Sequence, residues 1–216
     1  MACGDELSVR TRVKICGLTR IADVRDAAQA GADAIGFVFY PRSPRAVAVG
    51  QARELVAQVP PFVSSVGLFV NEDAGRVREI LQEVPLNLLQ FHGDETPDYC
   101  ESFDRPYIKA ARVRAGFDLL KYAVSHAGAA GLLADAWVDG YGGGGEPFDW
   151  NLLPAGFPLP LILAGGLSIA NISEAVRRVR PWAVDVSSGV EVTKGIKDRK
   201  LMEAFVAGVK EADGRE

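Results

Sequence analysis

The sequence predicts an α/β protein that folds as one (βα)8 TIM barrel. Eight short apolar stretches of strand type recur along the 216 residues, and segments with helical periodicity separate most of them. Strands that are apolar throughout are typical of a parallel sheet covered on both faces, and eight of them favour closure into a barrel. Periodicity alone leaves an open, doubly wound sheet as the alternative.

Each expected strand is a run of mostly apolar residues that stops at a polar or glycine-containing segment. The first reads "RVKICGL" and the last reads "AVDVSSGV". Such continuously apolar runs fit buried parallel strands. The full set covers residues 12–18, 34–40, 64–70, 87–93, 107–113, 131–136, 160–166 and 183–190.

The helices are predicted from apolar side chains spaced three or four residues apart. In the second unit, for example, this stripe consists of Ala52, Leu55, Val56 and Val59. The first helix starts at a threonine and ends near a glycine, which are common helix boundaries. The expected helices cover residues 19–31, 52–59, 77–84, 96–103, 118–126, 168–179 and 198–212, with a weak short one at 149–153.

The composition predicts one domain over residues 1–216, with residues 1–10 as a frayed N-terminal extension. Hydrophobic residues make up 48% of the chain and charged residues 24%, which is typical of a globular protein with a substantial core. The acidic start and the lack of an apolar run of about 18 residues favour a cytoplasmic protein without a membrane span. The net charge of -4 argues against nucleic acid or anionic membranes as partners.

The cysteines indicate a reducing compartment. Cys3, Cys16 and Cys100 are odd in number and have neither a CxxC spacing nor a nearby histidine. The pattern therefore predicts neither a disulfide framework nor a metal site. Taken alone, Cys16 is more typical of a small buried hydrophobic residue than of a reagent.

Reactive side chains at the carboxyl ends of the strands mark the expected active site, because barrels of this kind build their sites there. Alternation places Lys14 and Cys16 on one face of the first strand, and places Ala183, Asp185 and Ser187 together on one face of the eighth, its neighbour in a closed barrel. The charge of a buried Lys14 would favour a Cys16 thiolate, and Asp185, if it pairs with Lys14, would offset part of that effect. The reactive residues at these strand ends are Cys16, Arg42, Arg45, Gln90, His92, Asp135 and Asp185.

Two glycine-rich turns predict a phosphate site. They read "AGGLS", with Gly165 and Gly166, and "SSGVE", with Ser187, Ser188 and Gly189. Exposed backbone N–H groups near a helix start bind anions without cationic side chains, and the turns after strands seven and eight are a recurrent place for this. A further loop, "WVDGYGGGGEPFDW" at 137–150, is a candidate lid, and His126 is expected to be solvated near a helix end.

Seven stretches, in order and across nearly the whole chain, resemble the phosphoribosylanthranilate isomerase family of tryptophan biosynthesis. No single stretch is decisive, but the ordered set is highly specific. The stretches are "KICGLT" (14–19), "GADAIGFVFYPRSPR" (31–45), "VGLFVN" (66–71), "LLQFHGDE" (88–95), "YGGGGEPFDW" (141–150), "LAGGL" (163–167) and "AVDVSSGVE" (183–191).

The resemblance implies a cofactor-free Amadori rearrangement of N-(5-phosphoribosyl)anthranilate to 1-(2-carboxyphenylamino)-1-deoxyribulose 5-phosphate. It assigns Cys16 as general base, Asp135 as general acid and Arg45 to the anthranilate carboxylate, with Asp185 in the pocket. The two glycine-rich turns match the phosphate-binding turns of the family. The chemistry needs one acid to open the furanose and one base to take a proton from the sugar, so Asp135 must hold a proton while Cys16 is a thiolate with a lowered pKa.

The sequence leaves several assignments with more than one candidate. Lys14, Gln90 and His92 are expected to face the substrate, and Asp139 competes with Asp135 for the role of acid. A related histidine-pathway isomerase is the enzymatic alternative, although such relatives carry an aspartate where this chain has Cys16. The second alternative is a barrel that binds a phosphorylated ligand without catalysis. The expected partner is a small phosphorylated substrate, and the chain is expected to be a monomer or a homodimer.

Overall fold

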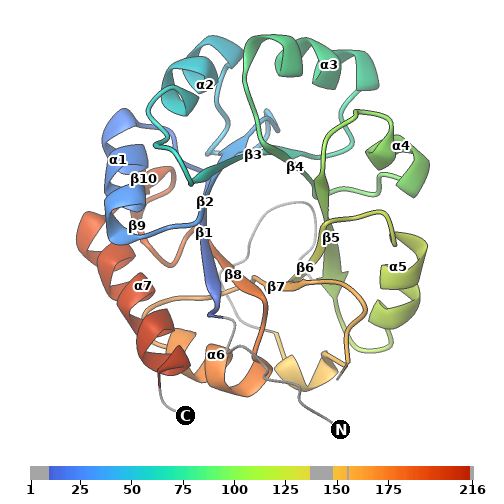
Figure 1. The fold of residues 1–216 in the computed structure, drawn as a ribbon, viewed down its shortest axis with the longest axis vertical. Coiled ribbons are helices and arrows are strands. Elements are labelled where there is room, and N and C mark those ends of the chain that lie inside the picture. Colours follow the sequence, from blue (N-terminus) through green and yellow to red (C-terminus); the bar gives the residue numbers. More distant parts are fainter. Residues whose placement is uncertain (1–9, 137–147, 155, 215–216) are drawn as a thin grey trace, which may run out of the picture.

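The chain forms a closed barrel of eight parallel strands, in a computed structural model that describes residues 10–136, 148–154 and 156–214. Hydrogen bonds between β1 and β8 close the ring, so the predicted barrel is confirmed and the open sheet is excluded (Figure 1). The strands are β1 (Arg12–Cys16), β2 (Ala34–Val38), β3 (Ser64–Phe69), β4 (Leu88–Phe91), β5 (Tyr107–Val113), β6 (Gly131–Ala136), β7 (Leu161–Leu163) and β8 (Ala183–Val186).

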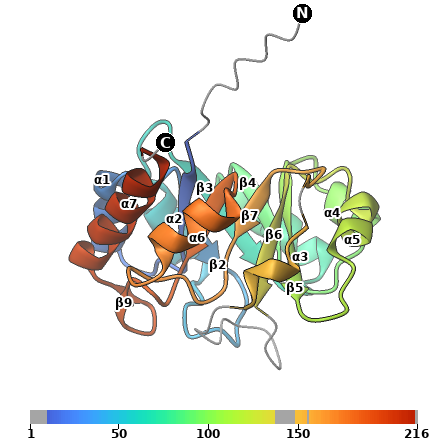
Figure 2. The same cartoon turned by 90° about the horizontal axis from the view of Figure 1, so that it is seen from below.

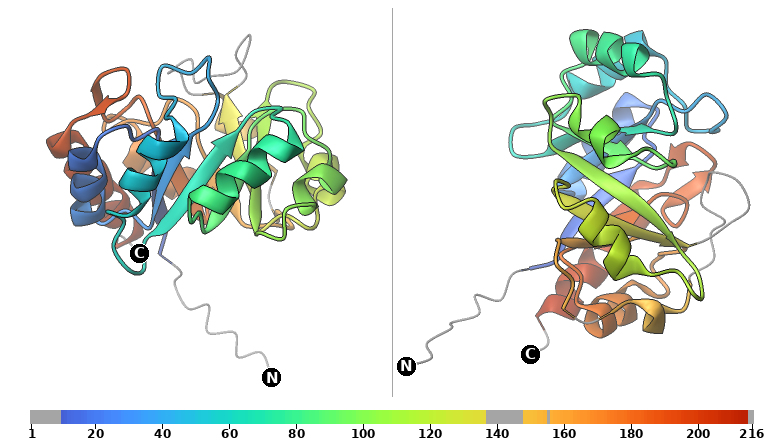
Figure 3. Two further views of the ribbon diagram at one scale, coloured as in Figure 1. Left: turned by 90° about the horizontal axis from the view of Figure 1, so that it is seen from above. Right: turned by 90° about the vertical axis from the view of Figure 1, so that its right-hand side faces the viewer.

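Helices surround the barrel and cover its outer face, as Figures 1 and 3 show from the end and from the side. They lie where helical periodicity predicts them, within a few residues at each end. Between β6 and β7 the described residues contain only a short 3-10 helix, η1. The helices are α1 (Ile21–Ala30), α2 (Val49–Val56), α3 (Ala74–Glu83), α4 (Pro97–Glu101), α5 (Leu119–Ser125), η1 (Trp150–Leu152), α6 (Ile172–Val179) and α7 (Arg199–Asp213).

The core has two layers because successive side chains of a strand point to opposite faces. Along β5, Ile108 and Ala110 belong to a small cluster inside the barrel, and Tyr107 and Ala111 pack in the layer beneath the helices. Lys109 stands between Ile108 and Ala110 in the sequence. It is therefore on the outer face, like Tyr107 and Ala111, and it is fully buried there. The outer layer is the larger of the two and contains most of the buried aromatic side chains.

Several strands end earlier than the sequence predicts, because their last predicted residues turn away to line the barrel mouth. The seventh strand ends at Leu163, and Gly165 and Gly166 follow with φ of 79° and 64°. These positive φ values suit glycine and cannot continue a strand. The eighth strand ends at Val186, so the predicted extension to residue 190 is wrong and forms a turn instead.

A two-stranded antiparallel sheet, which the sequence analysis did not predict, follows the eighth strand. It pairs β9 (Glu191–Thr193) with β10 (Ile196–Lys197). In Figure 2 β9 lies at the opposite end of the barrel from the start of β1. The small sheet therefore lies beside the carboxyl ends of the barrel strands, where a barrel enzyme binds its substrate.

His126 differs from its expected setting. It is 4% exposed, and its ring packs against Tyr122 with centroids 4.4 Å apart. The prediction of a solvated histidine is therefore wrong, because the residue caps α5 with its ring turned inward. None of the helices in the described part of the chain is both long and apolar enough to cross a membrane.

Candidate active site

A pocket of about 620 Å³ opens at the carboxyl ends of the strands. Most of the site residues expected from the sequence line it, and they come from six different strands or the turns that follow them. Lys14 and Gly189 are the expected residues outside its lining. The expected residues that line it are Cys16, Arg45, Gln90, His92, Asp135, Gly165, Gly166, Asp185, Ser187 and Ser188.

Lys14 and Asp185 form an ion pair beneath the pocket. They are register partners on β1 and β8, and Lys14 Nζ lies 2.9 Å from Asp185 Oδ1. Burial lowers the pKa of Lys14, but the charges of Asp185 and Cys16 outweigh it and hold that pKa above its ordinary value. Burial raises the pKa of Asp185, and Lys14 offsets only part of that rise. The lysine therefore stays charged beside the thiol.

Cys16 is a buried thiol, 4% exposed, at the end of β1. Burial raises its pKa above the ordinary value. The charge of Lys14, a hydrogen bond from Lys14 and the charge of Lys197 lower the pKa, while the charge of Asp185 raises it. The prediction of a lowered thiol pKa is therefore wrong in direction, because desolvation exceeds the effect of the two lysines.

Gln90, His92 and Asp135 form a hydrogen-bonded chain across the pocket. Gln90 Nε2 lies 3.0 Å from His92 Nδ1, and because an amide NH2 group can only donate, this placement of the amide assigns Nδ1 as an acceptor without a proton. The ring proton therefore lies on Nε2, which donates to Asp135 Oδ2 over 3.1 Å. The other carboxyl oxygen, Oδ1, accepts from the Ala136 backbone N–H at 2.8 Å. Two donors thus fix the orientation of the Asp135 carboxyl group.

The two glycine-rich turns meet at one edge of the pocket. Ser168 and Gly189 form an isolated parallel bridge, which joins the turn after β7 to the turn after β8. A Cβ on Gly189 would come within 2.0 Å of the Leu167 carbonyl oxygen, so only glycine permits this approach. Ser187 Oγ donates to the Cys16 carbonyl over 3.0 Å and ties the turn to β1. The turns therefore form one rigid edge.

Glu191 and Lys197 are polar neighbours of the pocket that the sequence analysis missed. Arg45 forms a bidentate pair with Glu191 through Nε and Nη2, at 2.8 and 2.7 Å. Lys197 Nζ lies 2.8 Å from Glu191 Oε1 and donates to the Ser187 carbonyl over 3.0 Å. Burial raises the pKa of Glu191, but hydrogen bonds from Arg45 and Lys197 outweigh it and keep the pKa below its ordinary value.

Two sequence predictions fall outside the described residues, namely Asp139 as a rival acid and the lid at Gly142–Gly145. Arg42, by contrast, lies within the described chain and lines the pocket. Over residues 10–136, 148–154 and 156–214, no group of three or more His, Cys, Asp or Glu side chains is arranged to hold a metal ion.

A closed barrel with a carboxyl group, a thiol and an edge of two glycine-rich turns around one pocket is typical of an enzyme of acid–base chemistry. The model of the N-(5'-phosphoribosyl)anthranilate (PRA) isomerase family matches residues 13–208. The chain belongs to this family. It converts N-(5-phosphoribosyl)anthranilate to 1-(2-carboxyphenylamino)-1-deoxyribulose 5-phosphate in tryptophan biosynthesis, and is thus an aldose–ketose isomerase.

Relatives and solved structures agree with this assignment. The N-(5'-phosphoribosyl)anthranilate isomerase of Dechloromonas aromatica is 60% identical over 205 residues, which is 95% of this chain and 99% of the relative. The corresponding enzyme of Leptothrix cholodnii is 58% identical, and the match covers 95% of this chain and 94% of the relative. The crystal structure of the Thermotoga maritima isomerase is 40% identical, with a TM-score of 0.85, 93% of this chain covered and 99% of that one. The family match decides against both alternatives weighed from the sequence.

Proposed function

We propose that Asp135 is the general acid of the isomerisation and Cys16 its general base. The observation that carries this proposal is that both side chains line one pocket, from β6 and β1, with the carboxyl group of Asp135 oriented by two donors. An acid and a base on different strands can reach different atoms of one sugar.

In the first step Asp135 gives its proton to the furanose ring oxygen. The bond between that oxygen and the anomeric carbon breaks, and the nitrogen lone pair forms the new C=N bond of a protonated Schiff base. Asp135 leaves this step as a carboxylate, which His92 Nε2–H and the Ala136 N–H stabilise. Because both donors are in place beforehand, the site needs little reorganisation as the charge develops.

In the second step the Cys16 thiolate removes the proton on the carbon next to the Schiff base. The electron pair of that C–H bond forms a C=C bond to the former anomeric carbon, and the π electrons of the C=N bond return to the nitrogen as a lone pair, which gives a neutral enolamine. The enolamine then becomes the ketone when its hydroxyl loses a proton and the former anomeric carbon gains one. Burial raises the pKa of Cys16, and the Lys14 ammonium offsets part of that rise by stabilising the thiolate that this step consumes.

The two ends of the substrate have separate contacts in this proposal. The phosphate binds the backbone N–H groups of the turns that contain Gly165, Gly166, Ser187, Ser188 and Gly189. The anthranilate carboxylate shares the Arg45 guanidinium with Glu191, and Gln90, His92 and Asp185 line the space between the two ends. A relative that is 36% identical was solved with reduced 1-(o-carboxyphenylamino)-1-deoxyribulose 5-phosphate, a ligand with both of these groups.

The test replaces each reacting group without changing its size. We expect Cys16→Ser and Asp135→Asn each to lower kcat about 10²- to 10⁴-fold, because each removes one proton-transfer group. Affinity for the reduced product analogue should change little. Cys100→Ala is the control, since this second buried thiol belongs to the core cluster of the outer layer and does not line the pocket. Full turnover by either active-site variant would refute the assignment.

We also propose that the chain forms a homodimer in the cytoplasm. The Thermotoga maritima relative is described as dimeric, and in this chain Phe62 is a fully exposed aromatic side chain, whose burial against a second copy would be favourable. Analytical ultracentrifugation of the protein and of Phe62→Ser should give a dimer and a monomer, and a monomeric parent protein would reject the proposal. The thiols of Cys16 and Cys100 are unpaired, which fits a reducing compartment and is testable by cell fractionation.

A further inference from the structure

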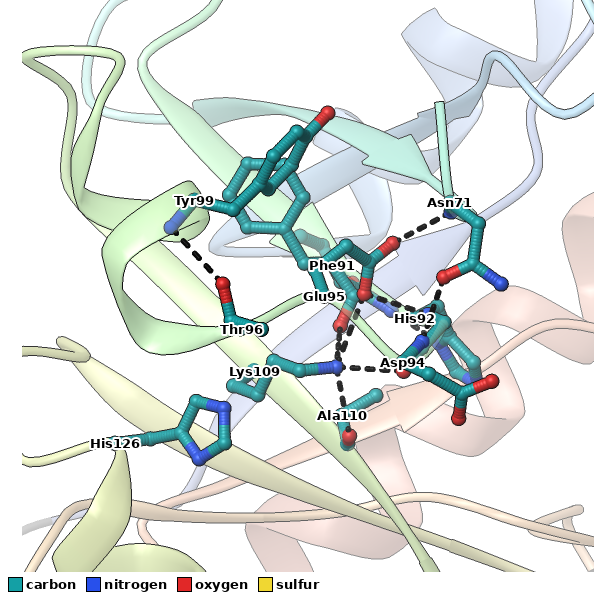
Figure 4. A network of polar contacts seen from close by, with 12 residues as sticks. Asn71, Phe91, His92, Asp94, Glu95, Thr96, Tyr99, Lys109, Ala110 and His126 are labelled. Atoms are coloured by element: carbon teal, nitrogen blue, oxygen red, sulfur yellow. Dashed lines mark hydrogen bonds and ion pairs between the residues drawn. The ribbon is translucent and has the colours of Figure 1, made fainter. Parts of the chain in front are cut away.

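A buried lysine on the outer face of β5 holds the segment that follows β4. Lys109 is fully buried, and Figure 4 shows its ammonium group at the centre of a set of polar contacts. Its Nζ lies 3.1 Å from Glu95 Oε2 and donates to the carbonyl oxygens of Gly93 and Phe91 over 2.7 and 3.3 Å. Lys109 does not line the pocket, so its charge acts on the loop and not on the substrate.

Glu95 completes this arrangement from the other side of the loop. It is 8% exposed, and its Oε2 also accepts from the Gly93 N–H over 2.9 Å. Its Oε1 accepts from the Asn71 N–H over 2.7 Å, at a residue in the left-handed conformation with φ of 48°. Asn71 in turn accepts from the Asp94 N–H over 2.7 Å. Glu95 therefore joins the loop after β3 to the loop after β4.

His92 lies between the two residues whose carbonyl groups Lys109 binds. Its own N–H donates to the Phe69 carbonyl over 2.9 Å, so the backbone is fixed at and around the histidine. The ring contacts Gln90 on one side and Asp135 on the other. A change in the loop would move this ring, and with it one of the two donors to the Asp135 carboxyl group.

We propose that Lys109 and Glu95 are positioning residues for the isomerisation, which hold the His92 backbone so that Nε2–H points at Asp135 Oδ2. This inference rests on the proposed role of Asp135 as the acid. An ion pair with 0% and 2% of its side chains exposed is expensive to bury, and an apolar pair of similar size would stabilise the fold at least as well. Its specific contribution is geometric, because it fixes the loop through hydrogen bonds that an apolar pair cannot make.

The first experiment measures kcat and KM for Lys109→Met and for the milder Glu95→Gln, which keeps the size of the side chain. We expect Lys109→Met to lower kcat on the order of 10- to 100-fold with little change in KM, because displaced catalytic geometry costs about this much. Glu95→Gln should have a smaller effect of the same kind, and it serves as the test if Lys109→Met does not fold. Thr11→Val is the control, since it removes a part-buried hydrogen bond to Asp213 at the other end of the barrel.

A background without the histidine separates positioning from general damage. Because Lys109 acts through His92, Lys109→Met should lower kcat no further when it is added to His92→Ala. If the two substitutions instead multiply their effects on kcat, Lys109 does not act through His92 and the inference is wrong.

A spectroscopic readout follows the ring itself. The chain has only two histidines, so ¹⁵N-histidine labelling gives one signal pair for His92 and one for His126, which His126→Gln assigns. We expect the protein to carry the His92 proton on Nε2, and Lys109→Met to give a mixture of tautomers while His126 is unchanged. Unchanged His92 signals together with an unchanged kcat would overturn the inference.

The same experiments keep the two proposals apart. If Asp135→Asn keeps full activity, the proposed acid is wrong, whereas the His92 signals still report whether Lys109 positions the ring. If Asp135→Asn is inactive and Lys109→Met behaves like Thr11→Val, the acid assignment stands and the positioning role is rejected.

Discussion

Lys14 and Lys109 are both buried strand lysines, and each forms an ion pair with a carboxylate, at 2.9 Å to Asp185 and at 3.1 Å to Glu95. Lys14 points into the barrel from β1, and its partner is its register neighbour on β8. Lys109 lies on the outer face of β5, and its partner belongs to a loop. The position of the Lys14–Asp185 pair therefore follows from the register of the sheet, whereas that of the Lys109–Glu95 pair depends on the conformation of a loop.

What surrounds each ammonium group determines what it can do. Lys14 acts on the Cys16 thiol through its charge and a hydrogen bond, so it changes the energy of a reacting atom. Lys109 is bonded to backbone carbonyl groups and to Glu95, so it changes where a loop lies. A buried charge in a barrel enzyme can thus either change the pKa of a reacting group or hold a loop in place through hydrogen bonds.

The largest expected effect comes from removing each lysine in turn. Lys14→Met should raise the pKa of Cys16, so the rising limb of the kcat/KM profile against pH moves to higher pH. Each unit by which the pKa rises leaves about tenfold less thiolate at neutral pH. Lys109→Met should lower kcat without moving that limb, because the positive charges that act on Cys16 belong to Lys14 and Lys197.

Stability provides the control for this pair of variants. Both should lose about 3–5 kcal/mol in the free energy of unfolding, because each leaves a buried carboxylate without its partner. Urea titrations of the two variants check this value. Equal losses of stability with different pH profiles would support two distinct roles, and identical pH profiles would remove the distinction.

The sequence places Lys14 and Asp185 on neighbouring strands, where they can pair, and it gives no sign of the Lys109 pair. Strand alternation together with closure of the barrel brings Lys14 and Asp185 to adjacent positions, although they are 171 residues apart. The contact of Lys109 with Glu95 depends on a loop that turns back on itself, beside a left-handed Asn71. Periodicity carries no information on such a turn.

Two other features escaped prediction for related reasons. The pair of Arg45 with Glu191 depends on the small β9–β10 sheet, which is too short to leave a periodic pattern. The direction of the Cys16 pKa depends on how completely the thiol is buried, and a sequence names the neighbouring charges without their degree of burial. The order of the strands was therefore predictable from the sequence, whereas the conformations of the loops and the desolvation of Cys16 were not.

A smaller effect of opposite sign is expected from Asp185→Asn. The charge of Asp185 raises the pKa of Cys16, so removing it should move the rising limb of kcat/KM to lower pH. The move should be smaller than that of Lys14→Met, since the charge of Lys14 acts more strongly on the thiol. The measurement is the pH at which kcat/KM reaches half of its plateau value, determined separately for each variant. A limb that moves upward would contradict the assignment of Cys16 as the group that titrates.

The smallest effect is expected at an exposed ion pair on the same loop that Lys109 holds. Arg112 and Asp94 are 3.0 Å apart, but the Asp94 side chain is 67% exposed. Water and salt screen such a pair, so Asp94→Ala should change the free energy of unfolding by about 0.2–1 kcal/mol and leave the His92 tautomer unchanged. The Asp94 N–H that donates to Asn71 survives this substitution. If Asp94→Ala instead disturbs the His92 signals as much as Lys109→Met does, the loop is held by its surface contacts, and the positioning role assigned to Lys109 loses its basis.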